Sequence, residues 1–334
     1  MNKHHYVAKE KGGPEVLSWQ AFKPAAPGNG EISVSVETAG VLLADVLWQM
    51  GITPIGPKPP FTPGYDIVGR IEAVGPGVSG LQAGQRVAAL LQYGGYTQHA
   101  VIPVKKAVPV PEGVDPQAAV AATTGYLTAY MLIVREGGLK QGDVLLVHGA
   151  GGGTGSALVE VASHMGIRVY GTASAEKFDL VRAKGGTPID YKTQDFVEVM
   201  RAAEPEGVDL VVDPIGSDVT TRSLKLLNKG GVLVSTAMIQ SMQGAGLPIP
   251  LQLLRLSLWS LTHPGKKAYF WDVVGATGKD WAQYRTDLAT VFDLLAAGHL
   301  SPKIDRVLPL QEAPQAQQLL LDYAAKGKIV LDCA

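Results

Sequence analysis

The sequence predicts an α/β protein in two parts: a small β-barrel or sandwich, and a doubly wound parallel sheet. Short strands punctuated by Gly and Pro turns fill the first third, and strands and helices alternate from about residue 115. The 334 residues are about twice the usual length of one domain, so two domains are expected. The hydrophobic content of 46% suffices for a sizeable core and excludes a disordered chain.

The strands of the first part are predicted from alternation and from turn residues. Residues 31–37 alternate between apolar and polar with period two, as a half-buried strand does. Residues 66–74 and 86–91 are similar, and the turns at 75–77 and 80–84 separate them.

The second part is predicted from alternating strand and helix patterns. Residues 116–134 predict a helix, after which the pattern alternates. The predicted strands are 143–148, 168–171, 187–191, 208–213 and 232–236, and the helices are 155–165, 175–184 and 220–228. Further helices are predicted at 246–261, 281–297 and 313–326, and strands at 304–308 and 329–332. The alternation is typical of a doubly wound sheet.

Composition excludes several classes of function. A net charge of −1 without a Lys/Arg-rich block argues against a nucleic-acid binder. The single cysteine, Cys333, excludes a disulfide framework and a thiolate metal cluster within the chain. The first residues show no apolar signal segment, and the apolar run 246–261 carries Arg255 and two prolines. We therefore expect a cytoplasmic protein without membrane insertion, with the run 246–261 forming an amphipathic helix at a packed surface or subunit contact.

The most informative segment is a glycine-rich turn between a predicted strand and a predicted helix, residues 143–165. Glycines at such a turn let the backbone approach a pyrophosphate, and the helix N-terminus offers N–H groups and a positive dipole end. The pattern predicts dinucleotide binding. The residues expected to bind are Ala150, Gly151, Gly152, Gly153, Thr154 and Gly155.

The end of the second strand indicates which dinucleotide is bound. NAD-binding proteins place an acidic residue there for the ribose hydroxyls. Here Ser174 and Lys177 follow the strand instead, and a hydroxyl with an ammonium suits the 2′-phosphate of NADPH. The alternative is that Lys177 is a solvated helix residue and Glu176 is a displaced acid.

These motifs resemble those of the medium-chain dehydrogenase/reductases, in the zinc-free quinone-oxidoreductase branch that includes zeta-crystallin-like and VAT-1-like proteins. The resemblance covers essentially the whole chain. Besides the glycine-rich turn it is carried by residues 11–17, 39–45, 63–69 and 327–331, and by Val74-Gly75 with Gly84-x-Arg86-Val87. It implies a GroES-like catalytic domain from residues 1–123 and 261–334, and a Rossmann NADPH-binding domain from residues 124–260.

The resemblance also implies that no metal is bound. Zinc-dependent relatives have a Cys and a His at the positions that correspond to Leu42 and Tyr65. Leucine cannot bind a metal, and a phenol rarely does. The four-cysteine zinc loop is absent, and His99 and His148 are expected to be structural. Tyr65 is the candidate catalytic residue, with packing at the barrel edge as the alternative.

Other site residues follow from the resemblance. Thr124 and Thr128 are expected near the nicotinamide and ribose, unless their hydroxyls bond to the preceding helical turn. Tyr191 is expected near the adenosine phosphate, with core packing as the alternative, and Ser235, Ala237 and Met238 would offer backbone groups beside the nicotinamide. Relatives carry polar or aromatic residues where this chain has Leu42, Leu47 and Thr53, so the substrate pocket is expected to be apolar. Phe270 is expected at the substrate cleft or at a subunit interface.

The leading hypothesis is an NADPH-dependent reductase that delivers hydride to a quinone or an α,β-unsaturated carbonyl compound. A second hypothesis is a biosynthetic tailoring enzyme that shapes a reactive intermediate, with or without net redox chemistry. A third is a non-catalytic NADPH-binding structural protein. The expected partners are a small apolar substrate and a second copy of the chain in a homodimer that uses residues 251–261.

Overall fold

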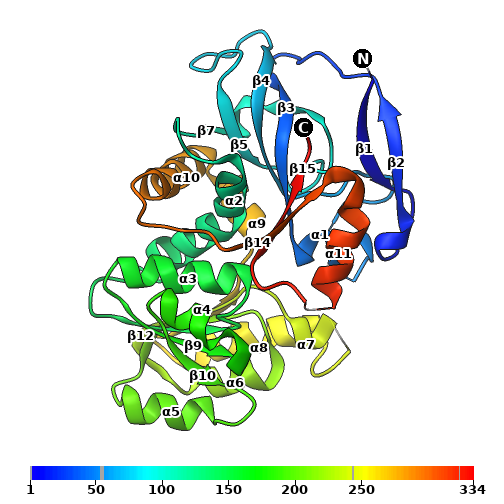
Figure 1. Ribbon diagram of the computed structural model, residues 1–334. Helices are drawn as coiled ribbons and strands as arrows, with labels where there is room; N and C mark the ends of the chain where they lie inside the picture. Colours follow the sequence, from blue (N-terminus) through cyan, green and yellow to red (C-terminus); the bar gives the residue numbers. More distant parts are fainter. Residues whose placement is uncertain (1, 53–55, 243, 323) are drawn as a thin grey trace. The chain divides into compact units, whose positions relative to one another are not determined.

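The computed structural model describes residues 2–52, 56–242, 244–322 and 324–334 (Figure 1). The chain divides into two compact units. Unit 1 comprises residues 1–127 and 277–334, and unit 2 comprises residues 128–276. Helix α2 (Pro116–Tyr130), which a π-helical turn (Met131–Glu136) extends, and helix α9 (Val273–Lys279) both cross the division.

Unit 1 is the predicted strand-rich part, and the return of the chain to it is also as predicted. Seven strands form one sheet in the order β14-β15-β3-β4-β5-β7 with β6 paired to β3, and β1 and β2 form an antiparallel hairpin. Strands β14 and β15, from the end of the chain, join strands from its beginning. Apolar residues that alternate along these strands, such as Val34 and Val36 on β3, form its core.

The elements of unit 1 have the following bounds. The strands are β1 (Lys3–Ala8), β2 (Leu17–Phe22), β3 (Glu31–Val41), β4 (Asp66–Val74), β5 (Arg86–Leu90), β6 (His99–Pro103), β7 (Ala107–Pro109), β14 (Ile304–Pro309) and β15 (Lys328–Asp332). The helices are α1 (Leu43–Gln49), α10 (Trp281–Ala296) and α11 (Ala313–Leu321). Asp280 caps the first turn of α10 by accepting the backbone N–H of Gln283, and Gly298 follows its end in a left-handed conformation.

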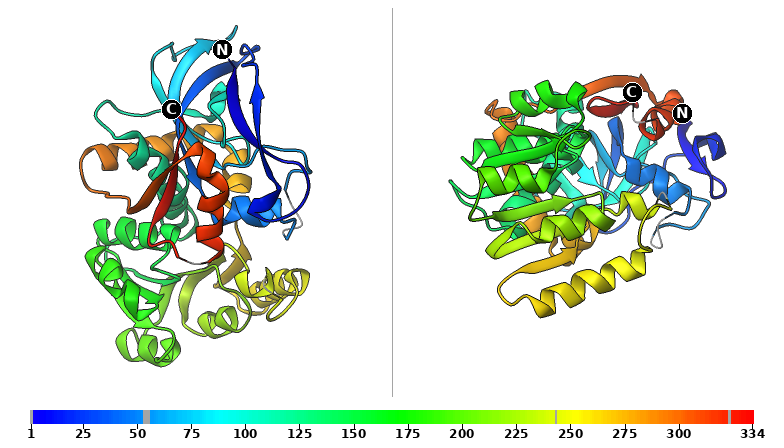
Figure 2. Two further views of the ribbon diagram at one scale, coloured as in Figure 1. Left: turned by 45° about the vertical axis from the view of Figure 1, so that its right-hand side comes forward. Right: turned by 90° about the horizontal axis from the view of Figure 1, so that it is seen from below.

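Unit 2 is the predicted doubly wound sheet. Six parallel strands lie in the order β10-β9-β8-β11-β12-β13, which is the Rossmann order. The strands are β8 (Val144–His148), β9 (Arg168–Ala173), β10 (Thr187–Asp190), β11 (Val208–Asp213), β12 (Leu227–Ser235) and β13 (Lys267–Phe270). The helices are α3 (Gly153–His164), α4 (Phe178–Ala183), α5 (Phe196–Ala203), α6 (Ser217–Leu224), α7 (Ile239–Met242) and α8 (Ile249–Thr262). Helix α8 packs against the edge strand β13 (Figure 2).

The division between the units differs from the predicted one at residues 261–276. Residues 261–276 were assigned to the returning catalytic domain, but β13 pairs with β12 and completes the parallel sheet of unit 2. The predicted helix 220–228 is also shorter, because α6 ends at Leu224 and Leu227 begins β12. The helix predicted at 313–326 ends at Leu321.

Among the described residues, one helical stretch is long and apolar enough to cross a bilayer. It is Pro116–Glu136, and 72% of its most apolar window is buried inside the fold. A core helix has the same length and composition, so this stretch is weak evidence for a membrane span.

Candidate functional site

The glycine-rich loop of unit 2 is shaped by contacts that exclude larger side chains. The buried strand β8 ends at His148, and Gly149 turns the chain with φ = 71°. A Cβ at Gly155 would lie 2.2 Å from the carbonyl oxygen of Gly149, so only glycine lets the loop close on the first turn of α3. A Cβ at Gly171 on β9 would lie 2.4 Å from the Cβ of Ala150, which packs the loop directly on the neighbouring strand.

The first turn of α3 is open to a ligand. Gly152 is the N-cap residue, and no side chain caps the helix. The first N–H groups of a helix have no partner within the helix, and the helix dipole adds partial positive charge there. That these residues bind a pyrophosphate stays a prediction, and the open first turn of α3 is consistent with it.

Lys177 lies beside this loop. A Cβ built on Gly151 would lie 2.6 Å from both Cβ and Cδ of Lys177, so the absence of a side chain at Gly151 makes room for the lysine stem. The backbone N–H of Lys177 donates to the carbonyl of Ser174 at 2.9 Å, which fixes the turn after β9. The ammonium group is thereby tethered near the end of β9, where the ribose end of a dinucleotide is expected.

Ser174 and Tyr191 complete this end of the loop, with one unexpected feature. The Ser174 hydroxyl donates to Oε1 of Glu176 at 2.6 Å, and this hydrogen bond holds the pKa of Glu176 below its usual value. Tyr191 follows β10, and its backbone N–H donates to the carbonyl of Ala173 at 3.4 Å. Its side chain is 58% exposed, which argues against the alternative of core packing.

The end of β12 presents backbone rather than side chains. The hydroxyl of Ser235 donates to the carbonyl of Ala237 at 2.9 Å, and the carbonyl of Ser235 accepts the backbone N–H of Trp271. The side chain of Met238 is buried in the core of unit 2 at 1% exposure. A ligand at this strand end would therefore meet the backbone, and the role predicted for these three residues stays a prediction.

The aromatic residues Tyr269, Phe270 and Trp271, at the end of β13 and directly after it, differ in their contacts. Tyr269 and Trp271 both donate to the carboxylate of Glu136, at 2.5 and 2.9 Å. Burial, with the nearby carboxylate, raises the pKa of Tyr269 above its usual value. Phe270 lies between them in sequence and is 37% exposed, so it is the member of the run that offers a surface.

The predicted pocket residues of unit 1 lie around the start of helix α1. Leu42 is the N-cap residue of α1 and Leu47 lies within the helix, and both are partly buried. Thr53 lies outside the described residues. Tyr65 is 5% exposed, and its ring lies 5.2 Å from that of Trp48.

Two buried carboxylates stand beside these residues, and sequence analysis missed both. Asp45 accepts the backbone N–H of Leu42 at 2.9 Å and the hydroxyl of Tyr96 at 3.1 Å. Burial raises the pKa of Asp45 to about 7. Asp66, directly after Tyr65, is fully buried and lies 3.3 Å from the ammonium of Lys328.

Thr124 belongs to this cluster. Its hydroxyl donates to Oδ2 of Asp66 at 2.5 Å, so it does not bond to the preceding helical turn. It is Thr123 that bonds to the preceding turn, at the carbonyl of Ala119. Thr128 is buried in unit 2. A Cβ at Gly40 would lie 2.1 Å from Oδ1 of Asp66, so glycine at this position leaves room for the carboxylate.

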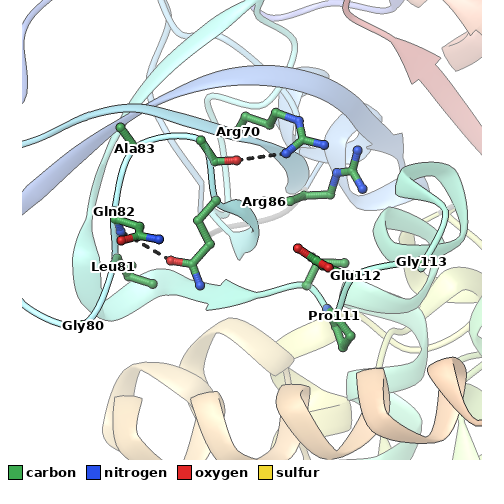
Figure 3. Close-up of a pocket in the computed structure, with 12 residues that line it drawn as sticks. Arg70, Gly80, Leu81, Gln82, Ala83, Arg86, Pro111, Glu112 and Gly113 are labelled. Atoms are coloured by element: carbon green, nitrogen blue, oxygen red, sulfur yellow. Dashed lines mark hydrogen bonds between the residues drawn. The ribbon is translucent and has the colours of Figure 1, made fainter.

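Two hollows in unit 1 do not coincide with the predicted site. One of about 930 Å³ opens between residues 80–86 and 110–113 (Figure 3). Its two arginines, Arg70 and Arg86, both form ion pairs with Glu37. A second, of about 470 Å³, is lined by residues that include His5, Tyr93 and Lys106. No predicted site residue lines either one.

Comparisons with known proteins agree with this arrangement. The family described as "Alcohol dehydrogenase GroES-like domain" matches residues 28–112, and that described as "Zinc-binding dehydrogenase" matches residues 186–331. The human "Synaptic vesicle membrane protein VAT-1 homolog" is 32% identical over 92% of this chain and 80% of its own length. The "2-haloacrylate reductase" of a Burkholderia species is 30% identical over 97% of this chain and 97% of its own length.

Among solved structures, the quinone oxidoreductase of Escherichia coli in complex with NADPH superposes with a TM-score of 0.86. It is 27% identical and covers 98% of this chain and 99% of its own. The chain belongs to the medium-chain dehydrogenase/reductases, in the quinone-oxidoreductase and VAT-1-like branch. The resemblance stated from the sequence motifs is thus confirmed, as are the GroES-like and Rossmann domains.

The two positions where zinc-dependent members of this family hold metal ligands carry Leu42 and Tyr65, as the sequence analysis describes. Among the residues that the structure describes, no group of three or more His, Cys, Asp or Glu side chains is arranged to hold a metal ion. Both histidines considered from sequence are held by hydrogen bonds: His99 to Glu72 and to the carbonyl of Ala25, and His148 to Thr172 and Ser223. Metal independence remains a prediction.

Proposed function

We propose that this medium-chain dehydrogenase/reductase transfers hydride from NADPH to a quinone or to the β-carbon of an α,β-unsaturated carbonyl compound. That it is an NADPH-dependent oxidoreductase follows from its family and from its NADPH-bound structural neighbours. The acceptor is the new element of the proposal. The observation that carries it is the apolar Leu42 at the position of a zinc ligand in metal-dependent relatives, with Tyr65 at the second such position.

The residues of unit 2 fit the cofactor. The loop from Ala150 to Gly155, together with the uncapped start of α3, would hold the pyrophosphate. Lys177 and Ser174 would hold the 2′-phosphate, with Tyr191 exposed beside them. Backbone groups after Ser235 would face the nicotinamide. Bound there, the cofactor supplies the hydride, while the protein provides orientation and excludes water.

The choice of acceptor follows from what the protein offers. An unactivated ketone usually needs a Lewis acid to stabilise the developing oxyanion. A conjugated acceptor spreads this charge over an enolate or a hydroquinone anion, so a few hydrogen bonds suffice and water can deliver the proton. Leu42 and Leu47 suit an apolar acceptor of this kind. The Burkholderia relative, named as a reductase of a conjugated acid, supports the same class.

The experiment is to mix the purified protein with NADPH and a panel of benzoquinones, naphthoquinones, enones, 2-alkenals and 2-haloacrylates. Loss of the absorbance of the reduced nicotinamide reports turnover. Gly155→Ala should abolish it, because the new Cβ would lie 2.2 Å from the Gly149 carbonyl oxygen. Gly278→Ala is the matched control, because a Cβ there meets nothing within 4 Å.

The outcomes separate the hypotheses. Oxidation of NADPH by quinones or enones, lost in Gly155→Ala alone, supports the proposal. Tight NADPH binding with no acceptor oxidising it would instead support a non-catalytic protein. Product formation without cofactor consumption would support a tailoring enzyme, and turnover of simple ketones alone would contradict the assignment of a conjugated acceptor.

A further inference from the structure

The buried histidine at the start of the glycine-rich loop lies in a chain of hydrogen bonds, and the donor and the acceptor of each bond can be assigned. His148 is the last residue of β8 and is 3% exposed. Its Nε2 lies 2.8 Å from Oγ of Ser223 on α6, and its Nδ1 lies 3.1 Å from Oγ1 of Thr172 on β9. The ring therefore connects β8 to a neighbouring strand and to a helix.

The proton on the Ser223 hydroxyl fixes the tautomer of His148. Ser223 Oγ lies 2.7 Å from the carbonyl oxygen of Val219, which can only accept. The single hydroxyl proton is used in that bond, so Ser223 must accept from His148 and Nε2 must carry the ring proton. Burial lowers the pKa of His148 and favours the neutral ring, in which Nδ1 is then an acceptor.

The other end of the chain leads to the cofactor loop. Because Nδ1 accepts, the Thr172 hydroxyl donates to it, and Oγ1 of Thr172 is left to accept the backbone N–H of Gly149 at 3.3 Å. The carbonyl of Thr172 accepts the N–H of Ala150 at 2.9 Å. Thr172 thus anchors the first two residues of the loop, and His148 fixes the orientation of its hydroxyl.

The position of Gly149 is transmitted to the phosphate-binding turn. Its carbonyl oxygen would lie 2.2 Å from a Cβ at Gly155, so the two residues are in direct contact at the first turn of α3. The carbonyl also accepts the N–H of Gly152 at 3.0 Å. A shift of Gly149 therefore displaces the N–H groups of this turn.

We propose that neutral His148 is a positioning residue for cofactor binding, and that protonation of its Nδ1 releases Thr172 and Gly149 and weakens the binding of NADPH. The inference rests on the proposed function, because it assumes that this loop binds NADPH. A protonated Nδ1 is a donor and can no longer accept the Thr172 hydroxyl proton. The Thr172 hydroxyl must then rotate, and the Nδ1–H of His148 competes with the Gly149 N–H for Oγ1 of Thr172.

The charged groups that face the His148 ring affect the pH at which the ring is protonated. Asp213 at the end of β11 favours the protonated ring, and Arg222 on α6 opposes it. Arg222 is itself paired with Asp195, and the ring of Phe196 on α5 makes a T-shaped contact with the His148 ring at 4.8 Å between centroids. Burial is the largest effect, so protonation is displaced to more acidic pH than in an exposed histidine.

The test measures the dissociation constant of NADPH from pH 8 down to the lowest pH at which the wild type stays folded, because burial displaces the titration of His148 below its ordinary value. The wild type and three variants are compared. His148→Asn keeps a carbonyl oxygen as acceptor and an amide donor but does not titrate. His148→Leu has no acceptor. Ser223→Ala removes the group that fixes the tautomer. The 2′-phosphate of the cofactor titrates in the same range, but it does so equally for every variant.

We expect His148→Leu to weaken NADPH about three- to tenfold at pH 8, the effect of losing one hydrogen bond. His148→Asn should bind nearly as the wild type does at pH 8 and more tightly than the wild type at the acidic end of the range. A ¹⁵N spectrum of labelled histidine in the wild type should show the proton on Nε2 of His148, and a mixed tautomer in Ser223→Ala.

These outcomes distinguish failure of the proposed function from failure of the positioning role of His148. If the wild type binds no NADPH at pH 8, the proposed function fails. If it binds NADPH but His148→Asn follows the same pH profile, or if the spectrum places the proton on Nδ1, the positioning role is wrong. Thermal unfolding of each variant, followed by circular dichroism, shows that a change in binding does not arise from loss of the fold.

Discussion

Replacing Lys177 by alanine should weaken NADPH and leave NADH nearly unchanged. The stem of this lysine lies against Gly151 of the phosphate-binding loop, so its ammonium is tethered where the adenosine ribose is expected. NADH lacks the 2′-phosphate and gains nothing from the ammonium. General destabilisation of unit 2 would weaken both cofactors, so the contrast between them isolates the phosphate contact.

The expected loss of NADPH affinity follows from the partial exposure of the Lys177 side chain. A hydrogen bond to a charged group contributes about 1.5–3 kcal/mol. Lys177 is partly exposed, and solvent and salt reduce the contribution to the lower end of that range. The expected loss in NADPH affinity is therefore about tenfold. It should shrink further as the salt concentration rises.

The assay is a fluorescence or calorimetric titration of both cofactors with the wild type and with Lys177→Ala. Lys229→Ala, which removes an exposed lysine from β12, is the matched control and should change neither constant. Wild-type protein that binds NADH as tightly as NADPH would refute the reasoning. So would a Lys177→Ala variant that loses affinity for both cofactors equally.

Glu176→Gln tests the same predicted 2′-phosphate site by removing a negative charge rather than a positive one. Glutamine keeps an oxygen that can accept the Ser174 hydroxyl proton but removes the negative charge beside the phosphate position. NADPH affinity should rise about two- to threefold, the size expected for an exposed charge pair, while NADH changes little. A fall in NADPH affinity would show that the carboxylate, rather than the hydroxyl, organises the site.

The remaining predictions concern unit 1 and the subunit contact. Elemental analysis should find no stoichiometric zinc, and chelators should leave activity intact; activity lost to a chelator and restored by zinc would contradict the metal-free prediction. Tyr65→Phe should lower kcat/KM about three- to tenfold if the phenol orients the acceptor, and an unchanged value would leave Tyr65 a packing residue beside Trp48. Asp45 has its pKa raised from 3.8 to about 7, so the stability it contributes is present at acidic pH and is lost as pH rises through 7. Asp45→Asn should therefore unfold at a higher temperature than the wild type at pH 8, and at no higher temperature at pH 4. Leu254→Lys, in the exposed leucine face of α8, should shift the predicted homodimer to monomer in light scattering; a wild type that is already monomeric would refute the predicted contact.

The parts of the fold that the sequence predicts are those encoded locally. An apolar strand, a glycine-rich turn and a helix with apolar residues at helical spacing occupy consecutive positions from Val144 to His164, and the structure has them there. Gly155 could be recognised as a close-approach residue because its role depends on neighbouring segments of one motif, whereas the close contact of Gly171 with Ala150 was not predicted. Tyr191 was expected beside the cofactor, and its exposure is consistent with that expectation.

The parts that were missed depend on partners distant in sequence. Strand β13 has only the residues Lys267–Phe270, begins with a lysine and shows no clear alternation. It is a strand because β12 offers it a hydrogen-bonding edge. Its absence from the predicted sheet displaced the domain boundary to residue 260. The hairpin of β1 and β2 was missed as well, and it is held together by cross-strand pairing and by rings such as those of His4 and Trp19.

The buried carboxylates of unit 1 show the same limitation at the candidate site. Comparison with zinc-dependent relatives drew attention to Leu42 and Tyr65, the positions of the ligands, and so to what this chain lacks. What it retains is two buried carboxyl groups: Asp45 three residues after Leu42, and Asp66 directly after Tyr65. Asp66 has an ammonium partner in Lys328, 262 residues away, and a hydroxyl partner in Thr124. Among the residues that the structure describes, no cation forms an ion pair with Asp45 and no group hydrogen-bonds to its Oδ1. Burial is the largest cause of the raised pKa of Asp45, and the neighbouring Asp66 adds to it. Lys328, which contacts Asp66, lowers the pKa of Asp45 only in part, so Asp45 keeps its proton up to about pH 7.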